Sequence, residues 1–262
     1  MYSVVFSSRQ QDSFSHNPLF GLLDSFENNT SEEEKSKSEF LIKFDSDDQN
    51  IPSNEKLNSY SFDIQKFVWD RHGGRGSLHE TQNILYNYVR KDCKFVQLIA
   101  DDFLFTRQGF VSEILEHSDT YKITGSPGMT DFNCPPGTHG YCPAFSTKVI
   151  DALGGITGPH CNADGVACCL AEKLRENYDY EIMFSPGNGT NYYIRTDTIT
   201  SRYVPSDIYA SMTYPPSSPE LKGFYNDYWS RASESVARSM YTDQLGGVLE
   251  LRRLVERGKN DA

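Results

Sequence analysis

The sequence predicts an α/β protein with a mainly parallel β-sheet flanked by helices. Short apolar runs rich in Val, Ile, Leu and Phe alternate along the chain with segments whose apolar residues recur at helical spacing. This alternation is typical of strand–helix–strand units, whose strands pair in parallel. Two of the runs also end in carboxylates, at Asp45 and at Asp101-Asp102. Because ligands of open α/β sheets bind where the strands end, these carboxylates mark a candidate site.

Size and composition are those of a globular protein. The chain has 262 residues, 37% of them hydrophobic and 23% charged, which suits one large α/β domain or one domain with an appendage. The formal net charge of −11 argues against a nucleic-acid partner. The apolar runs are strand-sized and the first residues lack a basic region, so we expect neither a transmembrane segment nor a secretory signal.

Cysteine usage indicates reduced thiols. With no export signal, the six cysteines are expected to be free thiols in the cytoplasm. One stretch offers zinc-ligand chemistry, with Cys134, His139, Cys142, His160 and Cys161. No two cysteines have the C-x2-C spacing, so a structural zinc site is not expected.

The expected strands are runs of β-branched, aromatic and other apolar residues bounded by polar or turn-forming residues. In chain order they are residues 2–7, 39–44, 66–69, 94–100, 121–124, 141–145 and 180–184. The fourth run contains five apolar residues and one Gln before Asp101, and its continuous apolarity predicts a buried parallel strand.

Helices are expected between these strands, where apolar residues recur at helical spacing. In chain order they are residues 14–26 with a start near Pro18, 52–60, 78–90, 106–117, a helix that stops at Gly154-Gly155, 166–174, and 219–256. Residues 28–38 are polar and acidic and are expected to be an exposed connection. Residues 125–140 and 186–219 are expected to be loops.

A loop rich in Gly and Arg lies between the third strand and the following helix, over residues 70–77. Glycine lets a backbone approach a ligand closely, and arginines such as Arg71 and Arg75 match phosphate or carboxylate oxygens. The N-terminus of the next helix also favours anions. The alternative is a surface loop with incidental basic residues.

The carboxylate pair Asp101-Asp102 directly follows the fourth expected strand. Buried carboxylates are costly to leave unpaired, so a cation is a natural partner. The alternative is that Asp101 caps a turn and Asp102 faces water. In the acidic cluster after the second strand, Asp48 is expected to lie in a solvated turn. Far along the chain, Asp164 has an equally good structural explanation, as the N-cap or a first-turn acid of its helix.

Five motifs occur in a fixed order over residues 1–185. They are Val4-Val5-Phe6-Ser7-Ser8-Arg9, the run from Phe40 to Asp47, the segment from Arg71 to Asn83, Ala100-Asp101-Asp102, and Gly140 to Phe145 followed by Leu153-Gly154-Gly155 and Ala163-Asp164. Together they resemble a family-2-type glycosyltransferase with the GT-A fold. The resemblance implies one GT-A-like domain over residues 1–185, with residues 186–262 as its acceptor-side loop and C-terminal helical extension.

The resemblance also implies a reaction, in which sugar passes from a nucleotide-sugar donor to a hydroxyl of a carbohydrate or other acceptor. It implies inversion at the sugar carbon and a divalent metal, Mn²⁺ or Mg²⁺. In that scheme Asp102 binds the metal, and Asp101 contacts the ribose or is a second ligand. Asp45 or Asp47 meets the base.

Further residues take roles by the same resemblance. Ser8 and Arg9 would flank the nucleoside, Arg71 and Arg75 would assist with charge, and Asp164 would be the general base. His139 or His160 is either a third metal ligand or a structural residue. The tyrosines after residue 186, including Tyr192 and Tyr193, either form an acceptor surface or pack in the core.

Two departures from the family pattern keep other functions open. Ile99 stands at the first Asp of the D-x-D motif, and Ala163 stands at the Glu of the Glu-Asp pair. Both favour a non-catalytic nucleotide- or carbohydrate-binding module. A sugar-phosphate nucleotidylyltransferase is a second alternative, but that class has a Gly-rich basic loop after its first strand, where this chain has Ser7-Ser8-Arg9-Gln10-Gln11.

Overall fold

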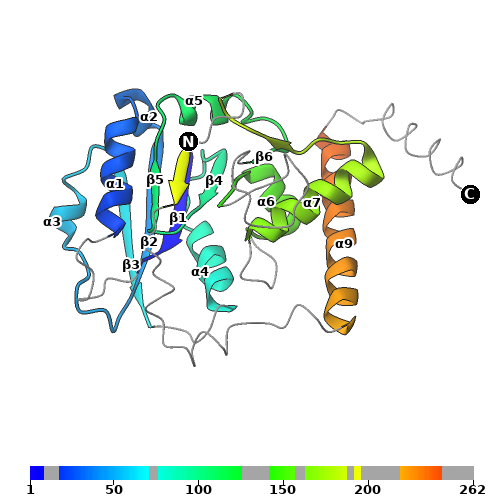
Figure 1. Ribbon diagram of the computed structural model, residues 1–262, viewed down its shortest axis with the longest axis horizontal. Helices are drawn as coiled ribbons and strands as arrows, with labels where there is room; N and C mark the ends of the chain where they lie inside the picture. Colours follow the sequence, from blue (N-terminus) through cyan, green and yellow to red (C-terminus); the bar gives the residue numbers. More distant parts are fainter. Residues whose placement is uncertain are drawn as a thin grey trace, which may run out of the picture.

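The computed structural model describes residues 1–8, 18–70, 76–125, 142–156, 163–187, 192–195 and 219–243 (Figure 1). The strands are β1 Tyr2–Ser7, β2 Ser38–Asp45, β3 Asp63–Trp69, β4 Phe95–Leu98, β5 Phe103–Phe105, β6 Ile123–Thr124, β7 Ala144–Ser146, β8 Met183–Phe184 and β9 Tyr193–Arg195. The helices are α1 Pro18–Asn29, α2 Glu32–Ser36, α3 Asn54–Leu57, α4 Gly76–Tyr86, α5 Phe110–Leu115, α6 Thr147–Leu153, α7 Ala163–Tyr178 and α9 Pro219–Asp243.

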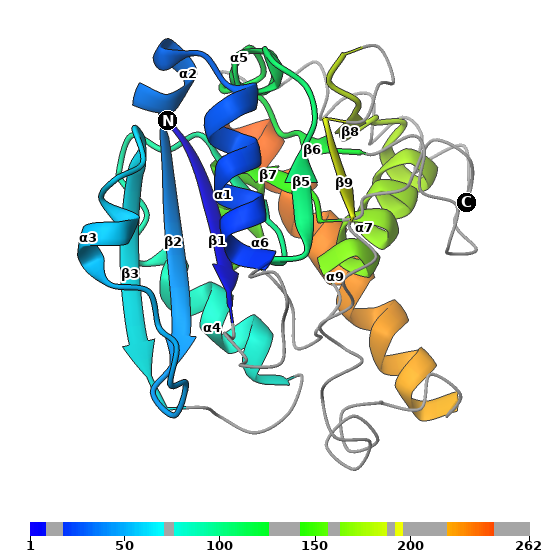
Figure 2. The ribbon, with the colours of Figure 1, turned by 60° about the vertical axis from the view of Figure 1, so that its left-hand side comes forward.

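A seven-stranded sheet with the order β3-β2-β1-β4-β7-β6-β8 forms the centre of the molecule. β1 pairs in parallel with β2 and β4, and β2 pairs in parallel with β3, so Figure 2 shows β1, β2 and β3 pointing to the same edge. β7 is antiparallel to both β4 and β6, and β6 is parallel to β8. The mainly parallel α/β sheet predicted from the sequence is confirmed.

The order of the strands reverses at β1. β2 and β3 are added on one side of it, and β4 begins the other side. Open α/β sheets bind ligands at such a switch in strand order, beyond the carboxyl ends of the two strands. A ligand-binding site is therefore expected at the ends of β1 and β4.

Both faces of the sheet are buried at β1, and alternate residues of this strand belong to different cores. Val4 and Phe6 lie in a cluster with α1, whereas Val5 lies in a cluster with side chains of α4, α6, α7 and α9. This period of two follows from the pleat of a strand. Burial on both faces also explains why the strands read as continuous apolar runs rather than alternating ones.

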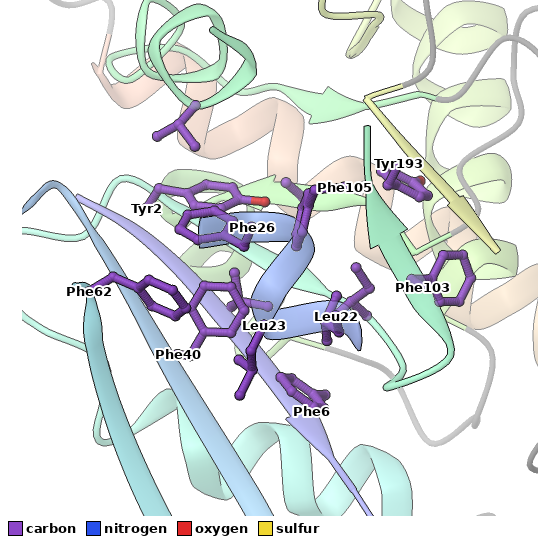
Figure 3. Close-up of a cluster of buried hydrophobic side chains, with 14 of the residues drawn as sticks. Tyr2, Phe6, Leu22, Leu23, Phe26, Phe40, Phe62, Phe103, Phe105 and Tyr193 are labelled. Atoms are coloured by element: carbon purple, nitrogen blue, oxygen red, sulfur yellow. The ribbon is translucent and has the colours of Figure 1, made fainter. Parts of the chain in front are cut away.

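The core on the α1 face is mostly aromatic. Phe26 of α1 lies with its ring centroid 4.8 Å from those of Phe40 and Phe62 and 5.2 Å from that of Phe105, all in edge-on arrangements (Figure 3). Such pairs add to the free energy gained by burying their area. The helix is therefore fixed on β2 and β5, the strand that follows the carboxylate pair.

A buried polar network crosses this same core and is centred on Gln97 of β4. The phenols of Tyr2 and Tyr192 donate hydrogen bonds to its Oε1 at 2.9 and 2.8 Å. Its Nε2 donates to the carbonyl of Cys142. Burial raises the pKa of both phenols well above its ordinary value, so both hydroxyls keep their protons at neutral pH.

The same network reaches two more strands. Ala144 N–H donates to Thr124 Oγ1 at 2.8 Å, and Thr124 Oγ1 lies 3.0 Å from the Tyr192 hydroxyl. Because the Tyr192 proton is directed to Gln97, the Thr124 hydroxyl donates to Tyr192. Gln97 of β4 thus binds Tyr2 of β1, Cys142 two residues before β7, and Tyr192 directly before β9.

Two strands were not predicted from the sequence. β5 and β9 form a separate antiparallel pair, in which Phe103 faces Arg195 and Phe105 faces Tyr193. β5 occupies the gap expected before a helix at 106–117, which begins only at Phe110, and β9 lies within a segment expected to be loop. Three-residue strands carry too little periodicity to be recognised in sequence.

The connection at residues 28–38 was also predicted wrongly, because it contains the short helix α2. Its start is a capping box in which Ser31 accepts from the Glu34 backbone and the Glu34 side chain accepts from the Ser31 backbone. Glu34 and Lys35 are buried rather than exposed. The Ser-x-x-Glu spacing is the pattern in the sequence that indicates this helix start.

Tyr192 and Tyr193 are 2% and 1% exposed, so of the two alternatives for these residues the packing role is confirmed. The helix α9 packs on α6 and α7, and its Asp243 binds Lys148 at 2.8 Å. The division of the chain at residue 185 stays a prediction. None of the helices in the described ranges is long and apolar enough to cross a membrane.

Replacing Gln97 with Leu should destabilise the fold by about 2–4 kcal/mol, because Tyr2 and the Cys142 carbonyl lose their buried partner. The free energy of unfolding in urea measures this. Gln82→Leu is the matched control, since Gln82 is 5% exposed and its side chain forms no hydrogen bond within the described part of the chain. An equal loss of unfolding free energy in the two variants would contradict a specific stabilising role of the Gln97 network.

Candidate functional site

The ends of β1 and β4 meet through a hydrogen bond between side chains. Val5 pairs with Leu98, so the register carried three residues further sets Ser8 level with Asp101. Ser8 Oγ donates to Asp101 Oδ2 at 2.7 Å, and both residues are buried. The parallel pairing thus joins two residues that lie 93 positions apart in the chain and that were both expected at a nucleotide site.

Asp101 and Asp102 form the turn between the large sheet and the small β5–β9 sheet. They are 5% and 1% exposed, so neither is a solvent-facing turn residue. Of the two alternatives raised by the sequence, the one in which Asp102 faces water is wrong. Two adjacent buried carboxylates are a costly arrangement in an apolar fold, and cations or hydrogen-bond donors offset that cost.

The donor chemistry of this pair fits a hard divalent cation, which prefers carboxylate oxygens. Within the part of the chain that the structure describes, no group of three or more His, Cys, Asp or Glu side chains could hold a metal ion. Asp101 and Asp102 therefore fit as part of a coordination shell, with further oxygen atoms needed from a ligand or from other residues. His139 and His160 lie outside the described residues.

Asp45, the last residue of β2, forms an ion pair with Lys43. The lysine is 5% exposed, and its ammonium lies 5.6 Å from the centroid of the Trp69 ring. The two paired residues are spaced by two along one strand, so their side chains share a face of the sheet. That spacing is visible in the sequence, where Lys43 was not recognised as part of the site.

The residues after Asp45 differ from expectation. Asp47 is exposed in the turn, so its carboxylate is accessible to a ligand that arrives from solvent. Asp48, expected to be solvated, is 8% exposed, and its Oδ1 accepts the Asn50 backbone N–H at 3.1 Å. The Asp48 carboxylate therefore shapes the turn itself, because an aspartate can accept from the backbone two residues on.

The segment before β7 comes to the same edge because β7 runs antiparallel to β4. Gln97 pairs with Ala144, so the residues before Ala144 lie beside those after Gln97. The Leu98 N–H donates to the Pro143 carbonyl at 3.0 Å. Cys142 is half-buried with φ 48°, so it turns the chain into β7 beside the end of β4.

Two motifs from distant parts of the sequence meet at Asn83. Its Oδ1 accepts the backbone N–H of Ile156 at 2.8 Å, directly after Gly154-Gly155. Gly154 ends α6 with φ 74°, a conformation that favours glycine. A Cβ atom on Gly155 would lie 2.8 Å from Asn83 Oδ1, so the close approach of α4 to this turn requires glycine there.

Asp164 is the second residue of α7, so its backbone lies in the first turn of that helix. The helix ends shortly before β8, which is parallel to β6. An α/β connection of this kind directs the start of the helix toward the edge where the strands end. The side chain of Asp164 lies outside the described part, as do Arg9, Arg71 and Arg75.

The chain is similar to known proteins in its fold. No protein-family model matches the sequence, and no curated protein matches it. The chain is similar to S. aureus TarS in complex with UDP-GlcNAc, with a TM-score of 0.53, 12% identity, and coverage of 97% of this chain and 70% of that chain. For S. aureus TarS in complex with UDP the TM-score is 0.52, with the same identity and coverage.

A longer S. aureus TarS chain matches with a TM-score of 0.50 and 12% identity over 74% of this chain. The match covers 36% of that TarS chain, so this chain spans about a third of its length. TarS is a GT-A-type family-2 glycosyltransferase, and the GT-A-like fold expected from the motifs is confirmed. A likeness at 12% identity shows a shared fold. The activity depends on the residues of the site.

Gly155→Ala should destabilise the protein by about 1–3 kcal/mol, because the new methyl group presses on Asn83. In an Asn83→Ala background the same change should cost less than about 1 kcal/mol, since the close contact is gone. Urea unfolding of the two single variants and the double variant measures the coupling. An equal cost of Gly155→Ala in both backgrounds would contradict the contact.

Proposed function

We propose that this protein is a glycosyltransferase that uses a nucleotide-sugar donor. The observation that carries the proposal is the buried group Ser8, Asp101 and Asp102 at the switch in strand order, on a GT-A-like fold. Ligands of α/β sheets bind at this place, and the carboxylates suit a cation that accompanies a diphosphate. A UDP-sugar is the first donor to test, because TarS of the same fold binds UDP and UDP-GlcNAc.

In the proposed complex the nucleoside lies across the ends of β1 and β2. Asp45 or Asp47 accepts a hydrogen bond from the base, and Ser8 and Arg9 flank the nucleoside. Asp101, oriented by its hydrogen bond from Ser8, faces the ribose or joins Asp102 as a metal ligand. Arg71 and Arg75 follow β3 in the chain, and their charges would offset those of the phosphates.

Asp102 and Asp101 would hold the divalent cation, Mn²⁺ or Mg²⁺. When bound, the cation supplies positive charge that stabilises the departing diphosphate. The chain contributes two buried carboxylates whose positions are fixed between the two sheets. Since their surroundings exclude water, their interaction with a cation is stronger than it would be at the surface.

Asp164 is the proposed general base. It takes the proton from the acceptor hydroxyl, whose oxygen attacks the anomeric carbon as the bond from that carbon to the diphosphate breaks. The electron pair of that bond leaves with the nucleoside diphosphate, so a single displacement inverts the sugar carbon. Ala163 stands where the family's Glu-Asp pair has its Glu, so Asp164 performs this step alone.

A thermal-shift screen tests nucleotide binding. UDP, GDP, dTDP or CDP with Mn²⁺, at about 100 times the dissociation constant, should raise the Tm by about 5–10 °C for the nucleotide that fits. Asp102→Asn should remove the part of the shift that depends on Mn²⁺. Asp119→Asn, a carboxylate with 85% of its side chain exposed, is the control and should leave it unchanged.

No stabilisation by any nucleotide with metal would contradict the proposal. Release of pyrophosphate from a nucleoside triphosphate and a sugar phosphate would identify a nucleotidylyltransferase instead. Binding without transfer to any acceptor would identify a non-catalytic module.

Asp164→Asn should lower kcat by about 10²–10⁴-fold, because the acceptor hydroxyl loses its base. Nucleotide affinity should stay at the wild-type value, since Asp164 touches the acceptor and not the nucleotide. Release of nucleoside diphosphate from an active donor–acceptor pair measures the first quantity, and calorimetry measures the second. A fully active Asp164→Asn variant would refute its role.

A further inference from the structure

Lys43 is a buried lysine at the end of a strand that leads into the candidate site. It is 5% exposed and lies two residues before Asp45. Lysine is among the residues least often buried, because its ammonium loses water and needs a partner. A buried ammonium at this edge of the sheet therefore needs polar or charged partners there.

The ammonium of Lys43 has two partners among the described residues. It pairs with the carboxylate of Asp45, of which 14% is exposed, and it lies over the Trp69 ring at 5.6 Å from the centroid. Asp45 and Trp69 are neighbours in the β2–β3 register, so the three side chains share one face of the sheet. The aromatic ring and the surrounding chain hold the ammonium in place.

The backbone of Lys43 has a second contact at the same edge. Its carbonyl accepts the N–H of Ser8 at 2.9 Å, and the Ser8 hydroxyl donates to Asp101. One residue of β2 is therefore bonded to Asp45 through its side chain and to Ser8 through its main chain. These contacts connect Asp45, Ser8 and Asp101, the described buried or half-buried residues assigned to the nucleotide.

We propose that Lys43 is the positioning residue of the nucleotide site, which fixes the carboxylate of Asp45 in the orientation that accepts the base. The inference rests on the proposed function. A carboxylate held by a buried ammonium keeps one rotamer before the ligand arrives. Less conformational entropy is then lost on binding, so the nucleotide binds more tightly than it would to a mobile side chain.

A purely structural ion pair is the competing explanation, and Lys35 provides the matched control. Lys35 is similarly buried, with 8% of its side chain exposed, and it pairs with Glu32 at 2.8 Å and Glu27 at 3.4 Å. It lies in α2, which precedes β2 and is therefore at the opposite edge of the sheet (Figure 2). Both lysines contribute to stability, but only Lys43 touches the candidate site.

The test is the dissociation constant of UDP with Mn²⁺, or of whichever of GDP, dTDP and CDP the screen selects, measured by calorimetry on the full chain. Lys43→Met should weaken nucleotide binding about tenfold, because Asp45 loses its orientation. Asp45→Asn should weaken it comparably. In Lys43→Met/Asp45→Asn the loss should equal that of Asp45→Asn alone, since Lys43 acts through Asp45.

Lys35→Met should bind the nucleotide as the wild type does, whatever its Tm. Two results would overturn the assignment of Lys43: wild-type affinity in Lys43→Met, or losses that add in the double variant. The double variant replaces both charges and so keeps the comparison valid if Lys43→Met alone is unstable. A wild-type protein that binds none of the four nucleotides would overturn the proposed function and the role of Lys43 with it.

Discussion

The parallel pairing of β1 with β4 is the constraint on which the rest of the structure depends. The strand order reverses at β1, with β2 and β3 added on one side of it and β4 on the other. The register of that single pair decides which residues stand level where the strands end. A shift by one residue would turn the side chains of a strand to the opposite face and separate Ser8 from Asp101.

The polar network around Gln97 explains how this edge is kept rigid. A glutamine in a fully buried strand is unfavourable unless its amide finds hydrogen-bond partners. Gln97 finds them in β1, in the segment before β7 and in the segment before β9. The aromatic packing of α1 against β2 and β5 acts on the same face. Asp101 and Asp102 therefore lie in a turn whose two strands are both anchored.

The chain shares its fold with TarS at 12% sequence identity. Folds of this kind support several reactions, so the residues of the site decide the function. Here the site contains residues that follow the family pattern, such as the carboxylate pair, and residues that differ from it, Ile99 and Ala163. The differences make nucleotide binding and catalysis separate questions for experiment.

The sequence by itself determined the α/β class, the buried strand before Asp101, the glycine stop of α6 and the carboxylates at the strand ends. These are local patterns of apolarity, turn-forming residues and charge, which act over a few positions. Only the tertiary structure decided that Ser8 binds Asp101, that Lys43 pairs with Asp45, and that β5 pairs with β9. Such contacts depend on strand order and register, which join residues far apart in the chain and leave no periodic signal in it.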